Sequence, residues 1–259
     1  MNITQLRNAT IVIDYDDICL LVDPMLADAG GLPPLKLFDG ERLRNPIVKL
    51  PENTEAVLSR VTHCLITHCQ KGHFDHLDRA GKRWLREKQI PVLCTARDAS
   101  YLRERGLLVQ ELTRLDKGPI PFFKGQINSI PCRHGSGIIG RLMEHGVGYF
   151  IRMPGHPSLY LAGDTVMTPT IQEFVASSQP EVSVIPAGGA RFEIGGEIIM
   201  DTDDVHEYLS LSQGMVIANH LEALSHCPIT RKDLHAALQE HANYHRLFTP
   251  LDGEVLCFE

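Results

Sequence analysis

The segment Ile66–Asp78, with the sequence ITHCQKGHFDHLD, places three histidines and two aspartates within thirteen residues. Its central loop, HFDH at 73–76, follows a short apolar run and precedes a stretch whose apolar residues recur at helical spacing. Three ligand-type side chains in a four-residue loop cannot all enter an apolar core, because burying them unpaired costs several kcal/mol. The fold must therefore bring partners to these side chains or leave them in water.

Imidazole nitrogens and a carboxylate suit Zn²⁺ or another first-row transition metal, whereas Ca²⁺ and Mg²⁺ prefer shells of oxygen. The segment alone leaves two interpretations open, a metal site and a polar surface turn. Three later residues favour the metal site: His134, Asp164 and His220 each follow a strand-like run, in the sequences IPCRHGSG, LYLAGDT and MVIANHLEA. The ligand-type residues therefore gather where predicted strands end.

Bulk properties limit the class of protein. The 259 residues are 43% apolar and 22% charged, as in soluble globular proteins with a substantial core. A net charge of −7 with scattered basic residues disfavours a nucleic-acid partner and favours a small-molecule substrate. No signal peptide or membrane-spanning run is visible, so we expect a cytoplasmic protein without a membrane partner. The seven cysteines form no CxxC pair and are expected to be reduced thiols.

Strand-like and helical runs alternate along the chain without an internal repeat or a flexible linker, which predicts a single domain over residues 1–259. Apolar runs at 9–13 and 18–22 flank an acidic turn and predict an antiparallel hairpin. The other predicted strands are 64–67, 92–94, 107–109, 126–131, 148–153, 158–162, 182–185, 215–218 and 254–258, and the predicted helices are 77–88, 97–105, 169–177, 203–211 and 230–240. Such a mixture indicates sheets covered by helices, with antiparallel as well as parallel strands.

The HxDH loop, the lone His134, the Gly-Asp-Thr sequence around Asp164 and the final His220 occur in an order that resembles the metallo-β-lactamase superfamily. The N-terminal hairpin and the compact length most resemble its L-ascorbate-6-phosphate lactonase-like branch. The resemblance implies an α/β fold, a four-layer αβ/βα sandwich of two mixed β-sheets flanked by helices. It also implies two divalent transition-metal ions at one edge, with zinc as the expected metal and manganese or iron as alternatives.

The resemblance implies a ligand set in three parts. In this set, His73 and His134 bind one metal ion, Asp75, His76 and His220 bind the second, and the carboxylate of Asp164 bridges the two. Superfamily members carry one more histidine two residues before position 73, where this chain has Lys71. An ammonium group cannot bind a metal. We interpret residues 69–72 as a bulge that replaces the usual single spacer and that Gly72 helps to close, so that His68 is the first ligand. The alternative is an incomplete first site.

Other residues near these motifs have less specific interpretations. His226 is interpreted as a partner of a ligand or as a helix-capping residue. Asp23 is interpreted as a cap or turn residue, with a buried acceptor beside a ligand as the alternative. Thiolate ligation by Cys69 or Cys132 is a less favoured alternative, because the expected ligand set is already complete.

The resemblance implies a metal-dependent hydrolase that uses a metal-bound hydroxide to cleave a small anionic ester or lactone. Asp75 is the predicted catalytic residue, since a carboxylate there can orient the nucleophile and carry its proton. Lys71 and Arg191 are the predicted substrate-binding residues, because their cations can bind an anionic group. A metal-dependent phosphodiesterase and a non-catalytic metal- or ligand-binding protein are the alternatives. A homo-oligomer is compatible with the sequence.

Overall fold

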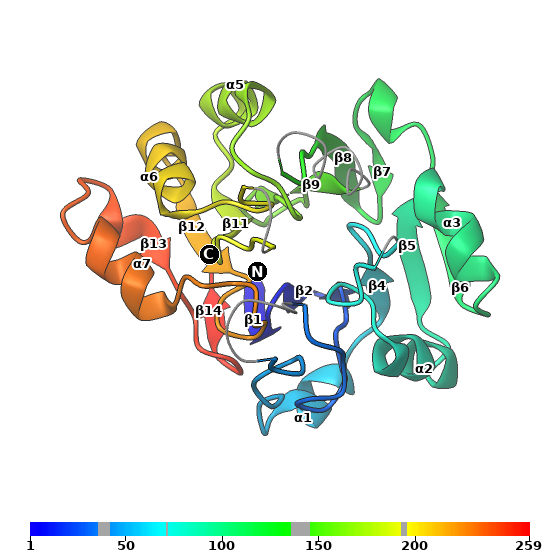
Figure 1. Cartoon of the computed structure of the whole chain (residues 1–259). Helices are drawn as coiled ribbons and strands as arrows, with labels where there is room; N and C mark the ends of the chain where they lie inside the picture. The colour runs from blue at the N-terminus through cyan, green and yellow to red at the C-terminus, as the bar shows by residue number, and fades with distance from the viewer. Residues whose placement is uncertain (36–41, 71, 136–145, 193–195) are drawn as a thin grey trace.

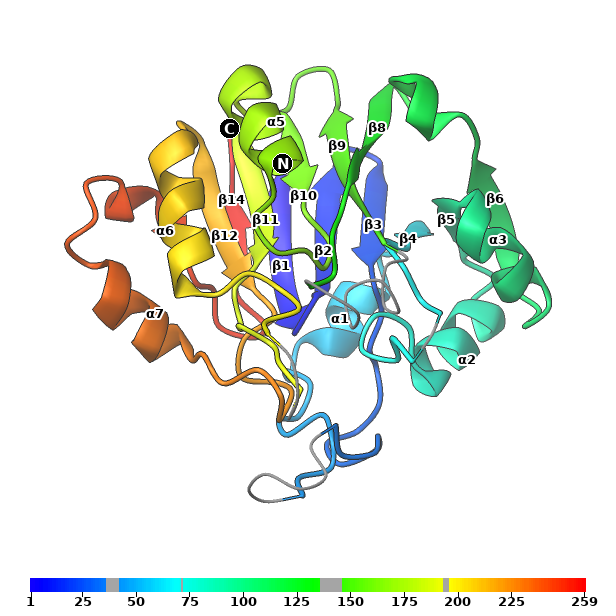
Figure 2. The same cartoon turned by 45° about the horizontal axis from the view of Figure 1, so that its top comes forward.

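The computed structural model describes residues 1–35, 42–70, 72–135, 146–192 and 196–259 (Figure 1). Within these residues, the strands form two seven-stranded sheets. The strand order is β14-β1-β2-β3-β4-β5-β6 in the first sheet and β13-β12-β11-β10-β9-β8-β7 in the second. Figure 2 shows the sheets between two groups of helices. The predicted four-layer αβ/βα sandwich is therefore confirmed.

The first sheet combines an antiparallel meander with parallel strands. Its members are β1 (Asn2–Arg7), β2 (Thr10–Tyr15), β3 (Ile18–Val22), β4 (His63–Leu65), β5 (Pro91–Thr95), β6 (Leu108–Leu112) and β14 (Val255–Cys257). Strands β14, β1, β2 and β3 pair antiparallel, and β3 to β6 pair parallel. The predicted hairpin is β2–β3. Strand β1 was not predicted because its sequence NITQLR is largely polar, although its last five residues are buried.

The second sheet has the same mixed character. Its members are β7 (Ile120–Phe122), β8 (Gly125–Pro131), β9 (Val147–Arg152), β10 (Leu159–Leu161), β11 (Val182–Pro186), β12 (Met215–Asn219) and β13 (Leu247–Phe248). Strands β7 to β10 pair antiparallel and β10 to β13 pair parallel. The short strands β7 and β13 were not predicted, and both lie at the edges of the sheet.

Helices cover the outer face of each sheet. The described residues contain α1 (Thr54–Leu58), α2 (Arg79–Glu87), α3 (Ala96–Arg103), α5 (Pro169–Ser178), α6 (Thr202–Leu211) and α7 (Arg231–Leu238), with 3₁₀ turns η1 (Leu115–Lys117) and η2 (Tyr244–Arg246). Side-chain caps define several starts: Asp78 accepts from the backbone of Gly81 before α2, and Thr230 forms a capping box before α7. No described helix combines the length and the apolar character needed to cross a membrane.

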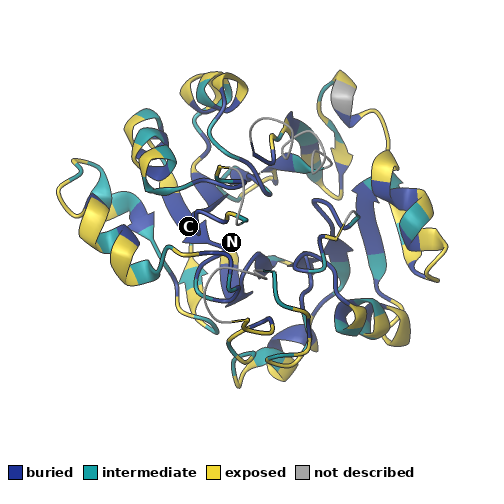
Figure 3. Ribbon diagram, viewed as in Figure 1, coloured by how far each residue is buried: buried dark blue, intermediate teal, exposed yellow. Residues whose placement is uncertain are grey.

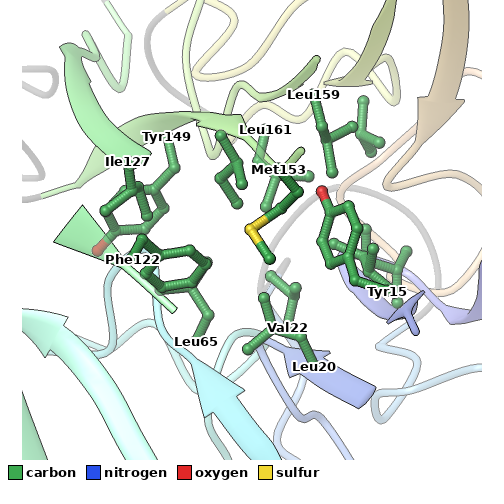
Figure 4. Close-up of a cluster of buried hydrophobic side chains, with 14 of the residues drawn as sticks. Tyr15, Leu20, Val22, Leu65, Phe122, Ile127, Tyr149, Met153, Leu159 and Leu161 are labelled. Atoms are coloured by element: carbon green, nitrogen blue, oxygen red, sulfur yellow. The ribbon is translucent and has the colours of Figure 1, made fainter. Parts of the chain in front are cut away.

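Three apolar layers hold the sandwich together. Between the sheets, Tyr15, Leu20 and Val22 from the first sheet face Tyr149 and Leu161 from the second (Figure 4). A second cluster joins α1, α2 and α3 to the first sheet, and a third joins α5, α6 and α7 to the second. Figure 3 shows the result, with buried strands inside and exposed residues on the outer sides of the helices. This core holds the strand ends of both sheets in fixed positions.

Candidate metal centre

Every predicted metal-ligating side chain lies in a segment that follows the C-terminal end of a strand. The segment from His68 to His76 follows β4 of the first sheet. His134, Asp164 and His220 follow β8, β10 and β12 of the second sheet. The candidate centre is therefore assembled from both halves of the sandwich.

The structure brings the seven predicted ligands into two buried clusters. Within each cluster, the candidate ligand atoms all lie within 4.8 Å of one another. The clusters consist of His68, His73 and His134, and of Asp75, His76, Asp164 and His220. His68 thus joins the first cluster although residues 69–72 separate it from His73 in the sequence. Gly72 has a φ of +91°. Lys71 lies outside the described residues.

The carboxylate of Asp164 faces both clusters. Its Oδ2 atom lies 3.0 Å from Nε2 of His76, with the corresponding distances 3.5 Å to His134, 3.6 Å to His220 and 3.9 Å to His68. One oxygen atom is therefore surrounded by four imidazoles from the two groups. Asp164 therefore lies close to imidazoles of both clusters.

Four of the histidines present Nε2 to the centre and use Nδ1 for a contact with the protein. Nδ1 of His68 lies 3.0 Å from Oγ1 of Thr67, and Nδ1 of His76 lies 2.9 Å from Oδ2 of Asp23. Nδ1 of His134 lies 2.7 Å from the carbonyl oxygen of Ile198. Nδ1 of His73 contacts the carbonyl oxygen of Gln70. A carbonyl oxygen can only accept, so Nδ1 carries the proton in His73 and His134. Nε2 is then left with its lone pair, as in metal-bound histidines.

The Nε2 atoms of His68, His73 and His76 have no hydrogen-bond partner among the described residues, although all three are buried. The 3.0 Å contact of His76 with Asp164 is an ion-pair distance without hydrogen-bond geometry. Each buried polar atom left unpaired costs about 1–3 kcal/mol. Metal ions placed among these nitrogens and the two carboxylates would satisfy them all, so the residues present fit a metal pair.

The two clusters differ in the charge of their histidines. In the second cluster, burial acts to lower the pKa of His76 and of His220, but the neighbouring acidic groups outweigh it and both pKa values are raised while no metal is bound. The first cluster behaves differently. Burial lowers the pKa of His68 and of His73, which keeps both imidazoles neutral and able to ligate. Burial acts to raise the pKa of Asp75 and of Asp164, but the neighbouring histidines outweigh it, and both pKa values are lowered. The two carboxylates are therefore anionic at neutral pH.

His220 is positioned by its backbone and by two polar neighbours. It has a left-handed φ of +60°, and its Nε2 atom lies 3.3 Å from Asp75 Oδ2. Asn8 Nδ2 lies 3.2 Å from the same nitrogen, and Cys227 Sγ lies 3.4 Å from Nδ1. Gly188 passes so close that a Cβ atom there would lie 2.2 Å from the carbonyl oxygen of His220. The end of β12 is therefore held against its neighbours by backbone contacts.

The other sequence candidates lie outside the two clusters. Arg191 is about half exposed, and its Nη1 atom lies 3.9 Å from Glu197 Oε1. It lines a groove of about 370 Å³ together with acidic side chains that include Asp201 and Asp203. The thiol of Cys69 contacts Asp98 Oδ1, and that of Cys132 contacts the carbonyl oxygen of Ala162. Neither thiol belongs to a described ligand cluster.

Sequence reasoning did not find most of the residues that orient the ligands. Asp23 was considered as a buried acceptor, and it does contact His76. Thr67, Gln70 and Asn8 were not considered as partners, although Thr67 and Gln70 lie close to predicted ligands in the sequence. Asn8 lies more than 200 residues away from His220 along the chain, so no local pattern could reveal that contact.

The sequence is similar to those of known proteins over most of its length. Residues 20–229 match the family described as the beta-lactamase superfamily domain. The chain belongs to the metallo-β-lactamase superfamily. Within the superfamily, it is 31% identical over 261 residues to the UPF0173 protein YddR of Bacillus subtilis, with complete coverage of both chains. A UPF0173 metal-dependent hydrolase of Azorhizobium caulinodans is 26% identical over 204 residues, which is 76% of this chain and 77% of that protein.

Among solved structures, an isothiocyanate hydrolase from Delia radicum gut bacteria superposes with a TM-score of 0.87. It is 30% identical, and the likeness covers 100% of this chain and 99% of that chain. These likenesses and the two His/Asp clusters identify this member of the superfamily as a metal-dependent hydrolase of the UPF0173 family.

Proposed function

We propose that this hydrolase works with two divalent transition-metal ions, with zinc as the expected metal. Each cluster would hold one ion and Asp164 would contact both, so that the ligands are His68, His73 and His134 for the first ion and Asp75, His76 and His220 for the second. The inward-facing Nε2 atoms and the position of Asp164 Oδ2 support this assignment.

When bound, such an ion pair supplies a hydroxide nucleophile at neutral pH and polarises the substrate atom that accepts charge. Asp75 is the residue proposed to orient the nucleophile and take up its proton. The side chain of Asp75 is 11% exposed, whereas that of Asp164 is 4% exposed. Of the two carboxylates, Asp75 is therefore the one that a substrate reaches more readily. Burial of the remaining ligands keeps bulk water away from the reacting bond.

As the substrate class we propose isothiocyanates, R–N=C=S. The observation that carries this proposal is the likeness to an isothiocyanate hydrolase over the whole chain. The central carbon of R–N=C=S is electrophilic, and attack by water forms a carbon–oxygen bond while the nitrogen takes a proton. The resulting thiocarbamate releases carbonyl sulfide and leaves the amine R–NH₂. In this proposal, Asp75 would carry the proton from the attacking water to the nitrogen.

A small anionic ester or lactone is the second candidate. Its support is the charge that the proposed centre would have, since two dications would contribute +4, the carboxylates of Asp75 and Asp164 −2 and the hydroxide −1. A surplus of about +1 favours an anionic group near the reacting carbon. Arg191 lies beside Glu197 in an acidic groove, which reduces its attraction for an anion. The predicted roles of Arg191 and Lys71 therefore remain predictions.

The test is a comparison of kcat/KM on matched substrates with protein reconstituted with zinc. The panel contains an aryl and an alkyl isothiocyanate, a carboxylated lactone with its neutral analogue, and bis(p-nitrophenyl) phosphate. Activity should be highest on the isothiocyanates, disappear after chelation and return with metal. Asp75→Asn should lower kcat at least about 100-fold, as expected for loss of a general base.

Each alternative predicts a different result. Turnover of the carboxylated lactone without turnover of isothiocyanates would establish the second candidate, and a preference for the phosphodiester would establish a phosphodiesterase. Two bound metal ions without turnover on any member of the panel would favour a non-catalytic binding protein. Equal rates on the neutral and carboxylated lactones would remove the proposed preference for anions.

A further inference from the structure

The bulge at residues 69–72 separates His68 from His73, yet both imidazoles lie in the first cluster. Their ring centroids are 4.4 Å apart. A four-residue spacer has more backbone freedom than a single spacer residue, and fixing each residue costs roughly 1–2 kcal/mol. Contacts that hold the bulge in place are therefore needed to keep the two histidines together.

Gln70 makes those contacts in two directions. Its side-chain amide Nε2 donates to the carbonyl oxygen of Arg97 at 2.7 Å and to Oδ1 of Asp98 at 3.0 Å. Its own carbonyl oxygen accepts from Nδ1 of His73 and, at 3.1 Å, from the backbone nitrogen of His73. Gln70 thus connects a candidate metal ligand to helix α3.

Asp98 lies in the first turn of α3 and is 1% exposed. Its Oδ1 atom accepts from the amide of Gln70 and from the thiol of Cys69, which lies 3.3 Å away. In that contact the thiol of Cys69 is the donor. One buried carboxylate oxygen therefore holds two consecutive residues of the bulge.

We propose that Gln70 and Asp98 are positioning residues for the first metal ion. Asp98 anchors the bulge to α3 through Cys69 and Gln70, and the carbonyl oxygen of Gln70 then fixes the ring of His73 with Nε2 directed into the cluster. The inference rests on the proposed two-metal centre and adds two residues that neither bind metal nor touch substrate. Contacts to the outer nitrogen of a metal-bound histidine typically change metal affinity about 10- to 100-fold.

The main test is a competitive chelator titration of Gln70→Ala and of wild-type protein. We expect the affinity of the first ion to fall about 10- to 100-fold in the variant, with the second ion bound as tightly as in wild type. The matched control is Gln172→Ala, which removes another amide-to-carboxylate hydrogen bond between elements, from Gln172 on α5 to Glu207 on α6. Neither residue of the control pair belongs to the candidate ligand clusters.

A spectroscopic measurement separates positioning from general stability. In protein loaded with Co²⁺, the Nδ1 proton of His73 should give a shifted NMR signal that exchanges slowly, because it is buried and donates to Gln70. Gln70→Ala keeps that carbonyl oxygen but frees the bulge, so this signal should broaden or exchange faster. The corresponding signal of His134, whose Nδ1 contacts Ile198, should be unchanged and serves as an internal reference.

Substitutions at Asp98 complete the test. Asp98→Asn retains an oxygen that can accept from Gln70, and should preserve most of the affinity for the first ion. Asp98→Ala should resemble Gln70→Ala, and the double substitution should be no worse than either alone, because the two residues act in one chain of contacts. A well-folded Gln70→Ala variant that binds both ions as wild type does would overturn the inference and leave the two-metal proposal intact. An equal loss of affinity for both ions in Gln70→Ala would also overturn the inference. Failure of wild-type protein to bind metal would instead reject the proposed function.

Discussion

Oδ2 of Asp23 lies 2.9 Å from Nδ1 of His76, so that a residue at the end of β3 holds a candidate metal ligand that follows β4. The same carboxylate accepts from the backbone nitrogen of Thr67 at 2.9 Å and contacts its hydroxyl at 2.5 Å. Burial raises the pKa of Asp23, and the contacts with His76 and Thr67 oppose that shift. One buried carboxylate therefore connects the N-terminal hairpin to the second cluster.

Asp23→Asn should lower the affinity for the second metal ion about 10- to 100-fold, because the amide is a poorer acceptor than the carboxylate for Nδ1–H of His76. The affinity of the first ion should change much less. Chelator competition with site-resolved Co²⁺ spectra measures both. The control is Asp14→Asn on the neighbouring strand β2, where the carboxylate of Asp14 lies 2.9 Å from Nη1 of Arg60. This substitution should leave the affinities for both ions unchanged. An unchanged second site in Asp23→Asn would show that the contact does not position His76.

His68→Ala should remove one of three imidazoles from the first cluster and therefore lower the occupancy of the first ion selectively. Lys71→Ala should leave both ions bound, since an ammonium group supplies no ligand atom. Metal content per chain after dialysis against a weak chelator measures the effect. Equal occupancy of both sites in His68→Ala would mean that the first ion is held without His68.

Gly188→Ala should disturb the second cluster through the backbone, since the new Cβ atom would lie 2.2 Å from the carbonyl oxygen of His220. The displaced His220 should bind the second ion more weakly, and the midpoint of thermal unfolding should fall. Gly155→Ala is the control: its φ of +77° brings backbone strain of about 1–2 kcal/mol, but no atom lies within 4 Å of the new Cβ. The control should lose stability without losing metal, and equal metal losses in both variants would contradict the prediction.

His226→Phe should reduce the acid sensitivity of the metal-free protein. The His226 imidazole is buried and stacks on Phe192, and burial lowers its pKa to about 4. In the unfolded chain its pKa is about 6.5, so below that pH the unfolded state binds a proton that the folded state does not. The contribution of His226 to the free energy of unfolding is therefore fully present above about pH 6.5 and is lost as the pH falls toward 4. Between pH 7 and pH 5 this group lowers the free energy of unfolding by about 2 kcal/mol.

Urea unfolding of wild type and His226→Phe at pH 7 and pH 5 measures this contribution. The decrease in the free energy of unfolding should be smaller in the variant, and Phe retains the stacking surface. His206→Phe is a suitable control, because His206 lies on the outer helix α6 and is exposed. The prediction fails if both variants show the same dependence on pH as the wild type.

The sequence was sufficient to predict which side chains form the two clusters, but not the residues that contact and orient them. His134, Asp164 and His220 could be found because each follows an apolar strand, and strand ends carry functional residues in sheets of this kind. The orienting contacts depend on how separate elements pack. Asp98 was hidden within a predicted helix, and only the approach of α3 to the bulge gives it a role. Strand β1 was missed for a related reason, since its polar residues Gln5 and Arg7 become buried through tertiary contacts.

The candidate ligands are spread over the chain from His68 to His220, and this order has a consequence for biosynthesis. At about 5–20 residues per second, a ribosome would add His220 roughly 8–30 s after His68. Until then the nascent chain can offer the first cluster two of its imidazoles, or three once His134 emerges, while the second cluster remains incomplete. The first cluster would therefore be complete about half-way through synthesis, whereas the second cluster would need a nearly finished chain, so the two ions of the proposed centre would be captured in sequence.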